Sequence, residues 1–410
     1  MSDLFATNLP ARNRTGRVWS AIFRASTTVG IVVLIILLLT IINNAFGYVA
    51  YESKVDPDSL ARDGVELEDM KKEQLVLVLQ ENVSKGLFRN LEHLQPFAER
   101  SRDDVYGLVL DRVVGYKIVQ IWNMLDTIRM SKEEALAEII DESPNAKIEF
   151  MSWLDLQFLT SPQSSDVVRA GIRTAILGSL WTILVAILFA FPIGVGGAIY
   201  LEEYAEENFI SRVIRTNIYN LSGVPSIIYG MLGLAIFVRM LNQLTSGAVF
   251  GLVDPLNSNG RTILSAGLTL GLLILPMIII NAQEAIKAVP GTLRLASFGL
   301  GGTRWQTVWH HVLPSALPGI LTGTILAISR AFGETAPLVV VGASHFIAND
   351  PTSPFSKFTT LPIQIYQWTS RPQAEFRSIA AAAIIVLLLL LLSLNTTAIL
   401  LRNRFSRRMN

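Results

Sequence analysis

Hydrophobic segments recur along the 410-residue chain, and polar stretches separate them. Six of these segments are long enough to cross a bilayer as helices, since one crossing takes about 20 apolar residues. They lie at 28–48, 172–200, 214–239, 262–283, 315–342 and 378–401. A basic front and an apolar core are also typical of a signal peptide, but the first segment is long and lacks a small-residue cleavage site. We therefore expect an uncleaved membrane helix there.

The segment 51–165 has the pattern of a water-soluble domain. Its apolar residues recur at helical spacing, as in Leu75, Leu79 and Val83, and acidic residues outnumber basic ones. The chain is therefore divided into a tail with a first membrane helix (1–50), a helical insertion (51–165) and a core with five membrane helices (166–410). The insertion contains no recognisable catalytic constellation.

Arginine and lysine indicate how the membrane helices are oriented, because positive loops stay on the cytoplasmic side. They gather in the N-terminal tail, in 201–215, in 284–314 and in the C-terminal tail. An even number of crossings places all four on one side, so both termini are expected in the cytoplasm and 51–165 outside it. We interpret the acidic residues of the 201–215 loop, Glu202, Glu203, Glu206 and Glu207, as a solvated surface.

Composition narrows the class of protein. With 51% hydrophobic and 16% charged residues and a mean hydropathy of +0.44, the chain is too apolar for a soluble protein, so we expect an integral membrane protein. A net charge of +1 gives no reason to expect a nucleic-acid partner. Without cysteine, neither disulfides nor thiolate metal sites are possible. The sequence contains neither a GxxxxGK[ST] loop nor an HExxH motif. We therefore expect no enzyme, no cofactor and no metal, and any ATP chemistry must come from another chain.

Two charges lie within the apolar segment 315–342, namely Arg330 and Glu334. Each costs roughly 2.5 to 3.5 kcal/mol to insert in a bilayer, so such residues usually face a pore or a partner group. Their i, i+4 spacing predicts that they share one face of a continuous helix. One interpretation is an internal ion pair that stabilises the bundle. The other is an anion site, because guanidinium offers a fork of donors suited to phosphate or carboxylate.

Glycine and proline interrupt the third hydrophobic segment at Gly223, Pro225 and Gly230. Interruptions of this kind are tolerated in a membrane where neighbouring helices or a water-lined cavity satisfy the freed backbone groups. They are typical of a transporter whose helices enclose a path, and equally of close packing through small residues. The two interpretations are compatible.

The 284–314 loop is longer than a plain connection needs. It predicts two short helices hinged at Gly299, Gly301 and Gly302. These helices would present Trp305, Val308 and Trp309 to a cytoplasmic partner. Alternatively, the tryptophans anchor the loop in the lipid interface.

Several motifs carry a resemblance to a known family. The 284–314 loop resembles the EAA motif of ABC-importer permeases, although Leu295 stands where that motif begins with Glu. Three further stretches resemble the permeases of the phosphate-specific transport system, most of all its PstA-type subunit. They are AIYLEEYA (198–205), SGVPSIIYG (222–230) and SRAFGETAPL (329–338). The resemblance covers about 155–405 well, 1–50 weakly and 51–150 not at all.

The resemblance implies an all-α integral membrane fold with six transmembrane helices of the type I, MetI-like kind, in the plasma (inner) membrane. It further implies half of an inorganic-phosphate pore, paired with a PstC-type permease, a PstB-type ATPase dimer and an extracytoplasmic PstS-type binding protein. Candidate residues for substrate translocation are Arg330, Glu334, Thr335, Ser226 and Tyr229. Candidate residues for coupling to the ATPase, which include those in register with the EAA motif, are Ala296, Ser297, Gly301, Trp305, Leu313 and Pro314.

Chemistry suggests how the two pore charges would act on phosphate. Arg330 would neutralise the anion, and an ionised Glu334 would accept a hydrogen bond from a protonated phosphate oxygen, which fully ionised sulfate lacks. Three alternatives remain at this point: a permease for another oxyanion such as molybdate or sulfate, a membrane-anchored sensor with 51–165 as receptor, and a self-sufficient secondary transporter.

Overall fold

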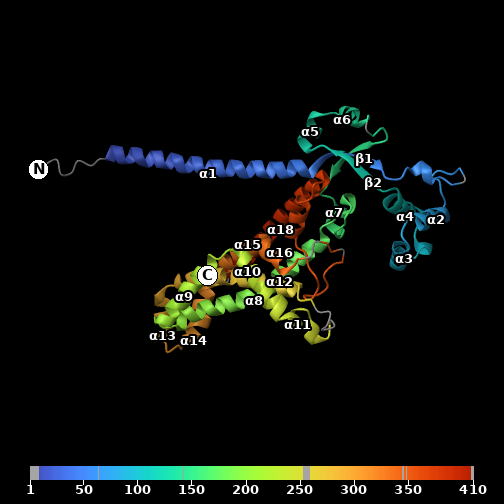
Figure 1. The fold of residues 1–410 in the computed structure, drawn as a ribbon. Helices are drawn as coiled ribbons and strands as arrows, with labels where there is room; N and C mark the ends of the chain where they lie inside the picture. Colours follow the sequence, from blue (N-terminus) through green and yellow to red (C-terminus); the bar gives the residue numbers. More distant parts are fainter. Residues whose placement is uncertain are drawn as a thin grey trace. The chain divides into compact units, whose positions relative to one another are not determined.

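The computed structural model describes residues 9–62, 64–141, 143–252, 259–343, 346–347 and 349–407. The chain divides into two compact units, Met1–Trp153 and Leu154–Asn410. The boundary precedes the expected end of the insertion at 165, because 154–165 belong to the second unit. Figure 1 shows the elements of each unit, coloured along the sequence.

The first unit begins with one long apolar helix, α1 (Leu9–Ala45). Its stretch Asn13–Ala45 is long and apolar enough to cross a membrane. Three hydroxyls inside it, on Thr27, Thr28 and Thr40, donate to the carbonyl four residues earlier at 2.8 to 2.9 Å. These polar groups are therefore satisfied within the helix, as an apolar surrounding requires. The helix ends at Ala45, so the expected extension to Tyr48 is wrong: residues 46–48 are extended.

After α1 the chain enters a three-stranded antiparallel sheet that the helical expectation for the insertion did not include. The strands are β1 (Phe46–Ser53), β2 (Tyr116–Ile121) and β3 (Lys147–Ser152), in the order β2-β1-β3. The register shifts between Ala50 and Tyr51, where β1 carries a bulge against β2. The strands are short and more than 20 residues apart in sequence, so helical periodicity between them dominates the pattern.

Helices and short turns make up the rest of the insertion. They are Pro57–Leu60 (η2), α2 (Lys72–Asn82), α3 (Lys85–Leu94), Phe97–Glu99 (η3), α4 (Arg102–Val109), the π turn Leu110–Val114 (η4), α5 (Met124–Arg129) and α6 (Lys132–Ile139). The predicted helical spacing is used in α2, where Leu75 and Leu79 are fully buried. They pack with Val105 and Val109 of α4 in one hydrophobic cluster.

The second unit is helical. Before its first membrane helix it has α7 (Leu156–Thr160) and the short turn Val167–Arg169 (η5). The remaining elements are α8 (Arg173–Ile199), the π turn Tyr200–Tyr204 (η6), α9 (Phe209–Ser222), α10 (Ser226–Gly233), the π turn Leu234–Met240 (η7), α11 (Asn242–Thr245), Ala248–Phe250 (η8), α12 (Ile263–Lys287), α13 (Gly291–Gly299), α14 (Arg304–Thr307), the π turn Val308–Val312 (η10), α15 (Leu313–Gly333), α16 (Ala336–Val341), α17 (Leu361–Thr369) and α18 (Ala374–Arg407).

Helix α12 is the centre of this unit. More than half of its apolar window is buried, a larger share than in the other candidate spans found among the described residues. Glycines let its neighbours approach closely: a Cβ on Gly194 of α8 would lie 2.7 Å from Ile278, and one on Gly323 of α15 would lie 2.3 Å from Asn281. Such close approach of a neighbouring side chain to a glycine is typical of helix packing in membranes. It fixes α8 and α15 against α12.

The expected membrane helices are confirmed in number only if one broken pair counts as a span. Five helices are long and apolar enough to cross by themselves, and α9 with α10–η7 makes a sixth, bent by 104°. The bend falls at Gly223–Pro225, where the sequence predicted an interruption. The expected span 315–342 is also broken: α15 ends at Gly333, and α16 starts at Ala336.

Candidate functional site

The break between α15 and α16 carries the two charges singled out in the sequence. Arg330 lies in the last turn of α15, whereas Glu334 has an extended backbone (φ −77°, ψ 121°) and ends the helix. The expected continuous helix face is therefore wrong. The two side chains nevertheless meet, with Arg330 Nε 3.7 Å from Glu334 Oε1, and they keep 44% and 21% of their surface exposed. Arg330 Nη1 also lies 3.3 Å from Met277 Sδ of α12.

Helix α10 packs against α16 and brings the other pore candidates near this break. A Cβ on Gly230 would lie 2.7 Å from Pro337 Cα, so the two helices touch through backbone. Tyr229 is buried, and its hydroxyl donates to the Leu221 carbonyl at 2.7 Å. Tyr229 thus braces the bend between α9 and α10. Ser226 and Thr335 are half-buried at the starts of α10 and α16.

The loop after α12 folds as the predicted pair of short helices. Helix α13 ends in a tight turn in which Gly302 N donates to Ser297 O at 3.0 Å and Gly301 N donates to Phe298 O at 2.9 Å. Gly301 has φ +83°, the left-handed conformation that this type of cap requires. Thr303 then begins α14 with a capping box to Gln306. The buried Ser297 Oγ lies 2.8 Å from Thr307 Oγ1 and ties the two helices together.

An apolar surface covers the outside of this pair of helices. Leu295, Leu300, Trp305 and Trp309 are 52% to 91% exposed, and the two indoles stack with their centroids 5.4 Å apart. Val308, expected from the sequence to be presented beside the tryptophans, is instead 2% exposed and packs inward. Ala296 is exposed, whereas Leu313 and Pro314 are half-buried at the start of α15. We call Leu295, Leu300, Trp305 and Trp309 the coupling surface.

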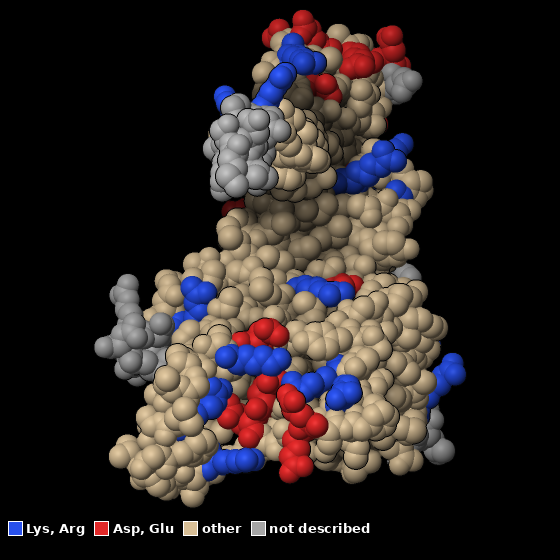
Figure 2. All heavy atoms as spheres, turned by 90° about the vertical axis from the view of Figure 1, so that its left-hand side faces the viewer, with Lys and Arg blue, Asp and Glu red and all other residues tan. Residues whose placement is uncertain are grey.

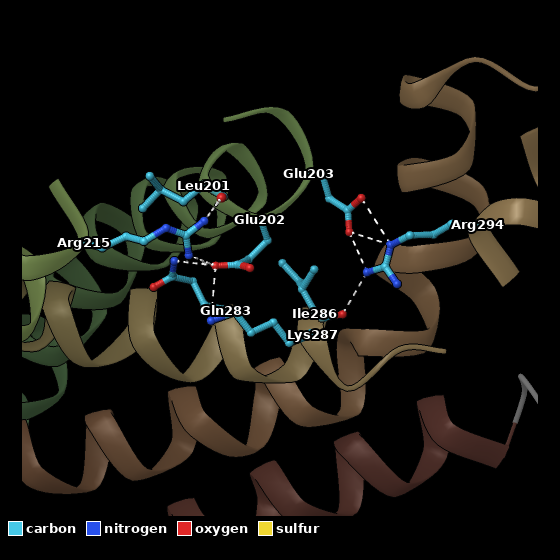
Figure 3. A network of polar contacts seen from close by, with 8 residues as sticks. All are labelled: Leu201, Glu202, Glu203, Arg215, Gln283, Ile286, Lys287 and Arg294. Carbon is cyan, nitrogen blue, oxygen red and sulfur yellow. Dashed lines mark hydrogen bonds and ion pairs between the residues drawn. The ribbon is translucent and has the colours of Figure 1, made fainter. Parts of the chain in front are cut away.

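Two glutamates, whose burial was not expected from the sequence, hold this end of the unit together. Figure 3 shows Glu203, in the π turn after α8, facing Arg294 of α13. Arg294 Nη2 and Nε donate to Glu203 Oε1 at 2.6 and 3.0 Å. Arg294 also donates to the Ile286 carbonyl at 3.0 Å and the Val289 carbonyl at 2.8 Å, at the end of α12. One guanidinium thus joins three elements.

Glu202 makes a second set of contacts beside the first. Its Oε1 accepts from Gln283 Nε2 at 2.7 Å and pairs with Arg215 of α9, and Lys287 Nζ lies 3.7 Å away (Figure 3). The side chains of Glu202 and Glu203 are only 9% and 10% exposed. The interpretation of this acidic run as a solvated surface is therefore wrong for these two residues, while Glu206 and Glu207 are exposed. The signal that could have found them is the presence further along the chain of Arg215, Lys287 and Arg294, three basic residues able to pair with them.

Charged side chains of both signs gather around this network on the surface. Figure 2 shows red and blue side chains side by side in the part of the second unit that carries α9 and α13. Within the described residues, no group of three or more His, Asp and Glu side chains is arranged to hold a metal ion. The chemistry available here is ion pairing and docking.

Comparison with known proteins identifies the class. The family model described as "Binding-protein-dependent transport system inner membrane component" matches residues 190–410, more than half of the chain. The protein belongs to this family of ABC transporter permeases, which are membrane subunits and not enzymes. It is accordingly a multi-pass protein of the inner membrane.

Among curated proteins, the chain is similar to several ABC transporter permeases. The chain is 34% identical over 239 residues to the probable ABC transporter permease protein YqgI of Bacillus subtilis, covering 55% of this chain and 76% of that one. It is 31% identical to the phosphate transport system permease protein PstA of Xylella fastidiosa, covering 61% and 82%. It is 35% identical to the permease PstC of Pasteurella multocida, covering 45% and 60%. The expected resemblance to phosphate permeases is confirmed.

Among solved structures, the chain is similar to the MetNI methionine ABC transporter in an inward-facing conformation. The TM-score is 0.44 at 18% identity, covering 57% of this chain and 95% of that one.

Proposed function

We propose that this permease forms half of the translocation path of an ATP-driven phosphate importer, in the position of a PstA-type subunit. The observation that carries the proposal is the Arg330–Glu334 pair at a helix break. It is a partly exposed cation within an otherwise apolar span, next to the carboxylate that a protonated phosphate needs. The names of the PstA and PstC relatives support phosphate as the substrate.

The geometry of the pair suits a site that exchanges partners. Arg330 Nε and Glu334 Oε1 are 3.7 Å apart, longer than a hydrogen bond. A partly exposed pair of this kind contributes little, at most about 1 kcal/mol. An arriving phosphate can therefore take over the guanidinium at small cost, while Glu334 accepts a hydrogen bond from its protonated oxygen.

Coupling to an ATPase is the second part of the proposal. The exposed tryptophans and leucines of the coupling surface supply an apolar docking patch on a short, tightly capped pair of helices. Large exposed apolar patches mark interaction sites. The Glu203–Arg294 contacts tie the patch to α8 and α12, so a push on α13 reaches the membrane helices. A PstB-type ATPase dimer is the expected partner. Because Leu295 replaces the first Glu of the EAA motif, its contact with the ATPase would be apolar.

The orientation follows from this coupling. If the coupling surface faces a cytoplasmic ATPase, both termini are cytoplasmic and the insertion, together with 241–261 and 343–377, is extracytoplasmic. A PstC-type permease would complete the pore and a PstS-type protein would deliver the anion. We propose that the insertion docks this binding protein or braces the partner permease.

A receptor role for the insertion is the alternative, and one cavity bears on it. A cavity of about 240 Å³ in the first unit is lined by Tyr51, Tyr106 and Tyr116 together with Asp58, Glu66 and Glu68. Lys147 also lines the cavity, but three carboxylates outnumber this one cation and disfavour an anion there, since like charges repel. This chemistry speaks against the insertion as the phosphate receptor of a sensor.

The test is uptake by the complete transporter reconstituted in vesicles. Labelled phosphate should accumulate only with ATP, and excess sulfate or molybdate should leave uptake nearly unchanged. Equal competition by either anion would point to a different oxyanion importer. Uptake without the ATPase would point to a secondary transporter.

A further inference from the structure

A second cationic site lies at the opposite end of α12 from the Glu202–Glu203 network. A cavity of about 400 Å³ is lined there by the polar side chains of Asn259, Arg261 and Lys357, and its walls are formed by Val339, Gly342 and Ala343. Arg261 stands just before α12, whereas Lys287 is the last residue of that helix. A helix of 25 residues is about 37 Å long, so the cavity and the network lie about one membrane thickness apart.

The two cations are brought together by backbone contacts. Ile263 N donates to Ser356 O at 3.1 Å, and Leu264 N donates to Pro354 O at 2.8 Å. These bonds fasten the segment before Lys357 to the first turn of α12, next to Arg261. The cavity therefore combines two cations that are 96 positions apart in the sequence.

Gly342 makes room for the arginine. Its φ of +104° lies in the left-handed region, and a Cβ there would come within 2.5 Å of Arg261 Cδ and 2.8 Å of Arg261 Nε. The Arg261 side chain thus lies directly against the bare backbone at the end of α16. Asn259 Oδ1 accepts from the Arg261 backbone N–H at 3.0 Å, which leaves the Asn259 amide nitrogen as a further donor.

Across the described parts of the chain, no carboxylate forms an ion pair with Arg261 or Lys357. Arg173, by contrast, has its Nε 2.9 Å from Asp350 Oδ2. The described residues that line this cavity include no carboxylate, and their guanidinium, ammonium and amide donors have the chemistry of an oxyanion site.

The cavity also lies one short helix away from the pore charges. Its wall is the end of α16, and Glu334 and Thr335 precede the start of that helix. Six residues of helix extend about 9 Å. One end of α16 therefore meets the cavity, and the other end meets the break that follows Arg330 of α15.

We propose that Arg261, Lys357 and Asn259 form an outer binding site for an oxyanion such as phosphate. This site holds the anion before it reaches Arg330. The proposal rests on the proposed function for its direction of transport and its substrate. The binding itself can be measured independently of transport.

The experiment uses the absence of cysteine in the natural chain. Val339, a wall residue that is 44% exposed, is replaced by cysteine in the full transporter. The rates of its modification by a negatively and a positively charged methanethiosulfonate are then compared, with and without inorganic phosphate. The same comparison is made in Arg261→Gln/Lys357→Gln. Arg239→Gln is the matched control, because Arg239 is a nearby cation that does not line the cavity. Its neighbour Val238 packs against Gly260, where a Cβ would lie 2.6 Å from the Val238 carbonyl oxygen.

We expect the negative reagent to be favoured in the natural background and in Arg239→Gln. The ratio of the two rates should fall by about tenfold in the double variant, because two nearby positive charges are lost. Phosphate should slow modification only where both cations are present. The rate of the positive reagent verifies that the double variant is folded and accessible.

Two outcomes would contradict the proposed oxyanion site. One is an unchanged ratio of rates in the double variant. The other is protection by the phosphate-binding protein but not by free phosphate, since the cations would then serve a protein carboxylate. If the transporter moves an oxyanion other than phosphate, the proposed function is wrong, but the oxyanion site is not thereby contradicted. The ratio of the two modification rates still tests whether the cavity attracts anions.

Discussion

Arg294 of α13 and Glu203 of the π turn after α8 form a nearly buried ion pair, although 91 positions separate them in the sequence. The same guanidinium donates to two carbonyls at the end of α12. A short surface helix is thereby fastened to the two membrane helices that it must move if the coupling surface receives an ATPase.

Replacing Arg294 with Met should release α13 without unfolding the membrane core. Removing one partner leaves a buried, unpaired Glu203, which costs roughly 3 kcal/mol locally. ATP-driven uptake should fall at least tenfold, and backbone amides of α13 should exchange with deuterium faster. Arg212→Met is the control, because Arg212 is exposed on α9. Unchanged exchange in Arg294→Met would show that α13 is held by other contacts.

Arg330→Ala should abolish phosphate uptake while the transporter still assembles. A hydrogen bond to a charged group contributes about 1.5 to 3 kcal/mol, so a loss of more than tenfold is expected. Lys should restore uptake only in part, because an ammonium lacks the planar fork. Met277→Leu, which removes the sulfur near Arg330 but no charge, should keep uptake. Full-rate uptake by Arg330→Ala would favour a purely structural ion pair.

Gly301→Asp should uncouple the permease from its ATPase. The left-handed conformation at Gly301 costs a side-chain-bearing residue roughly 1 to 2 kcal/mol, which strains the turn between α13 and α14. Gly299→Asp places the same charge two residues away, where no φ constraint applies and a Cβ meets no atom within 4 Å. Co-purification of the ATPase should be reduced for the first variant and retained for the second. Equal yields would argue against the turn as a docking element.

Shortening the insertion should weaken assembly or raise the phosphate concentration needed for uptake, with selectivity retained. Replacing 55–145 by a short polar linker keeps the β1–β3 pairing, in which Tyr51 faces Lys147. If the acidic insertion steers a basic partner, the defect should become milder at high salt. Normal transport combined with loss of a response to another ligand would instead make the insertion a sensor module.

Acid should loosen α4 of the insertion. Hydrogen bonds from the Ser101 hydroxyl and backbone lower the pKa of Asp104. A lowered folded pKa means that this stabilisation is present above the unfolded pKa and is lost as pH falls through the folded one. Amide exchange in α4 should therefore rise in acid, and Asp104→Asn should raise it already at neutral pH. Asp103→Asn, at an 87% exposed side chain, should have little effect. Equal behaviour of the two variants would contradict the cap.

Local patterns predicted most of the membrane core. Runs of apolar residues determine where α8, α12 and α18 lie, and Gly301 marks the turn between α13 and α14, because these depend on neighbours in sequence. The bend at Gly223–Pro225 could equally be predicted from the glycine and proline in the sequence. Apolar residues at helical spacing also indicated the helices of the insertion.

Long-range pairing was not readable from the same patterns. The strands of the insertion meet across stretches of helix, so alternation over six to eight residues gave little signal. Glu203 depends on Arg294, far along the chain, to become buried. Glu334 ends α15 although its i, i+4 spacing from Arg330 suits a continuous helix, because the chain turns there to pack Pro337 against Gly230.

The glycine contacts of α12 have a mechanical consequence. A Cβ on Gly267 would lie 2.5 Å from Val185 Cβ, and Gly194 and Gly323 approach side chains of α12 as closely. Sliding α8 or α15 along α12 would press these side chains against the backbone of the facing helix. We therefore expect the three helices to tilt together as one rigid body. A thrust delivered at the Arg294 end would be transmitted over its whole length, and the opposite end would swing with it.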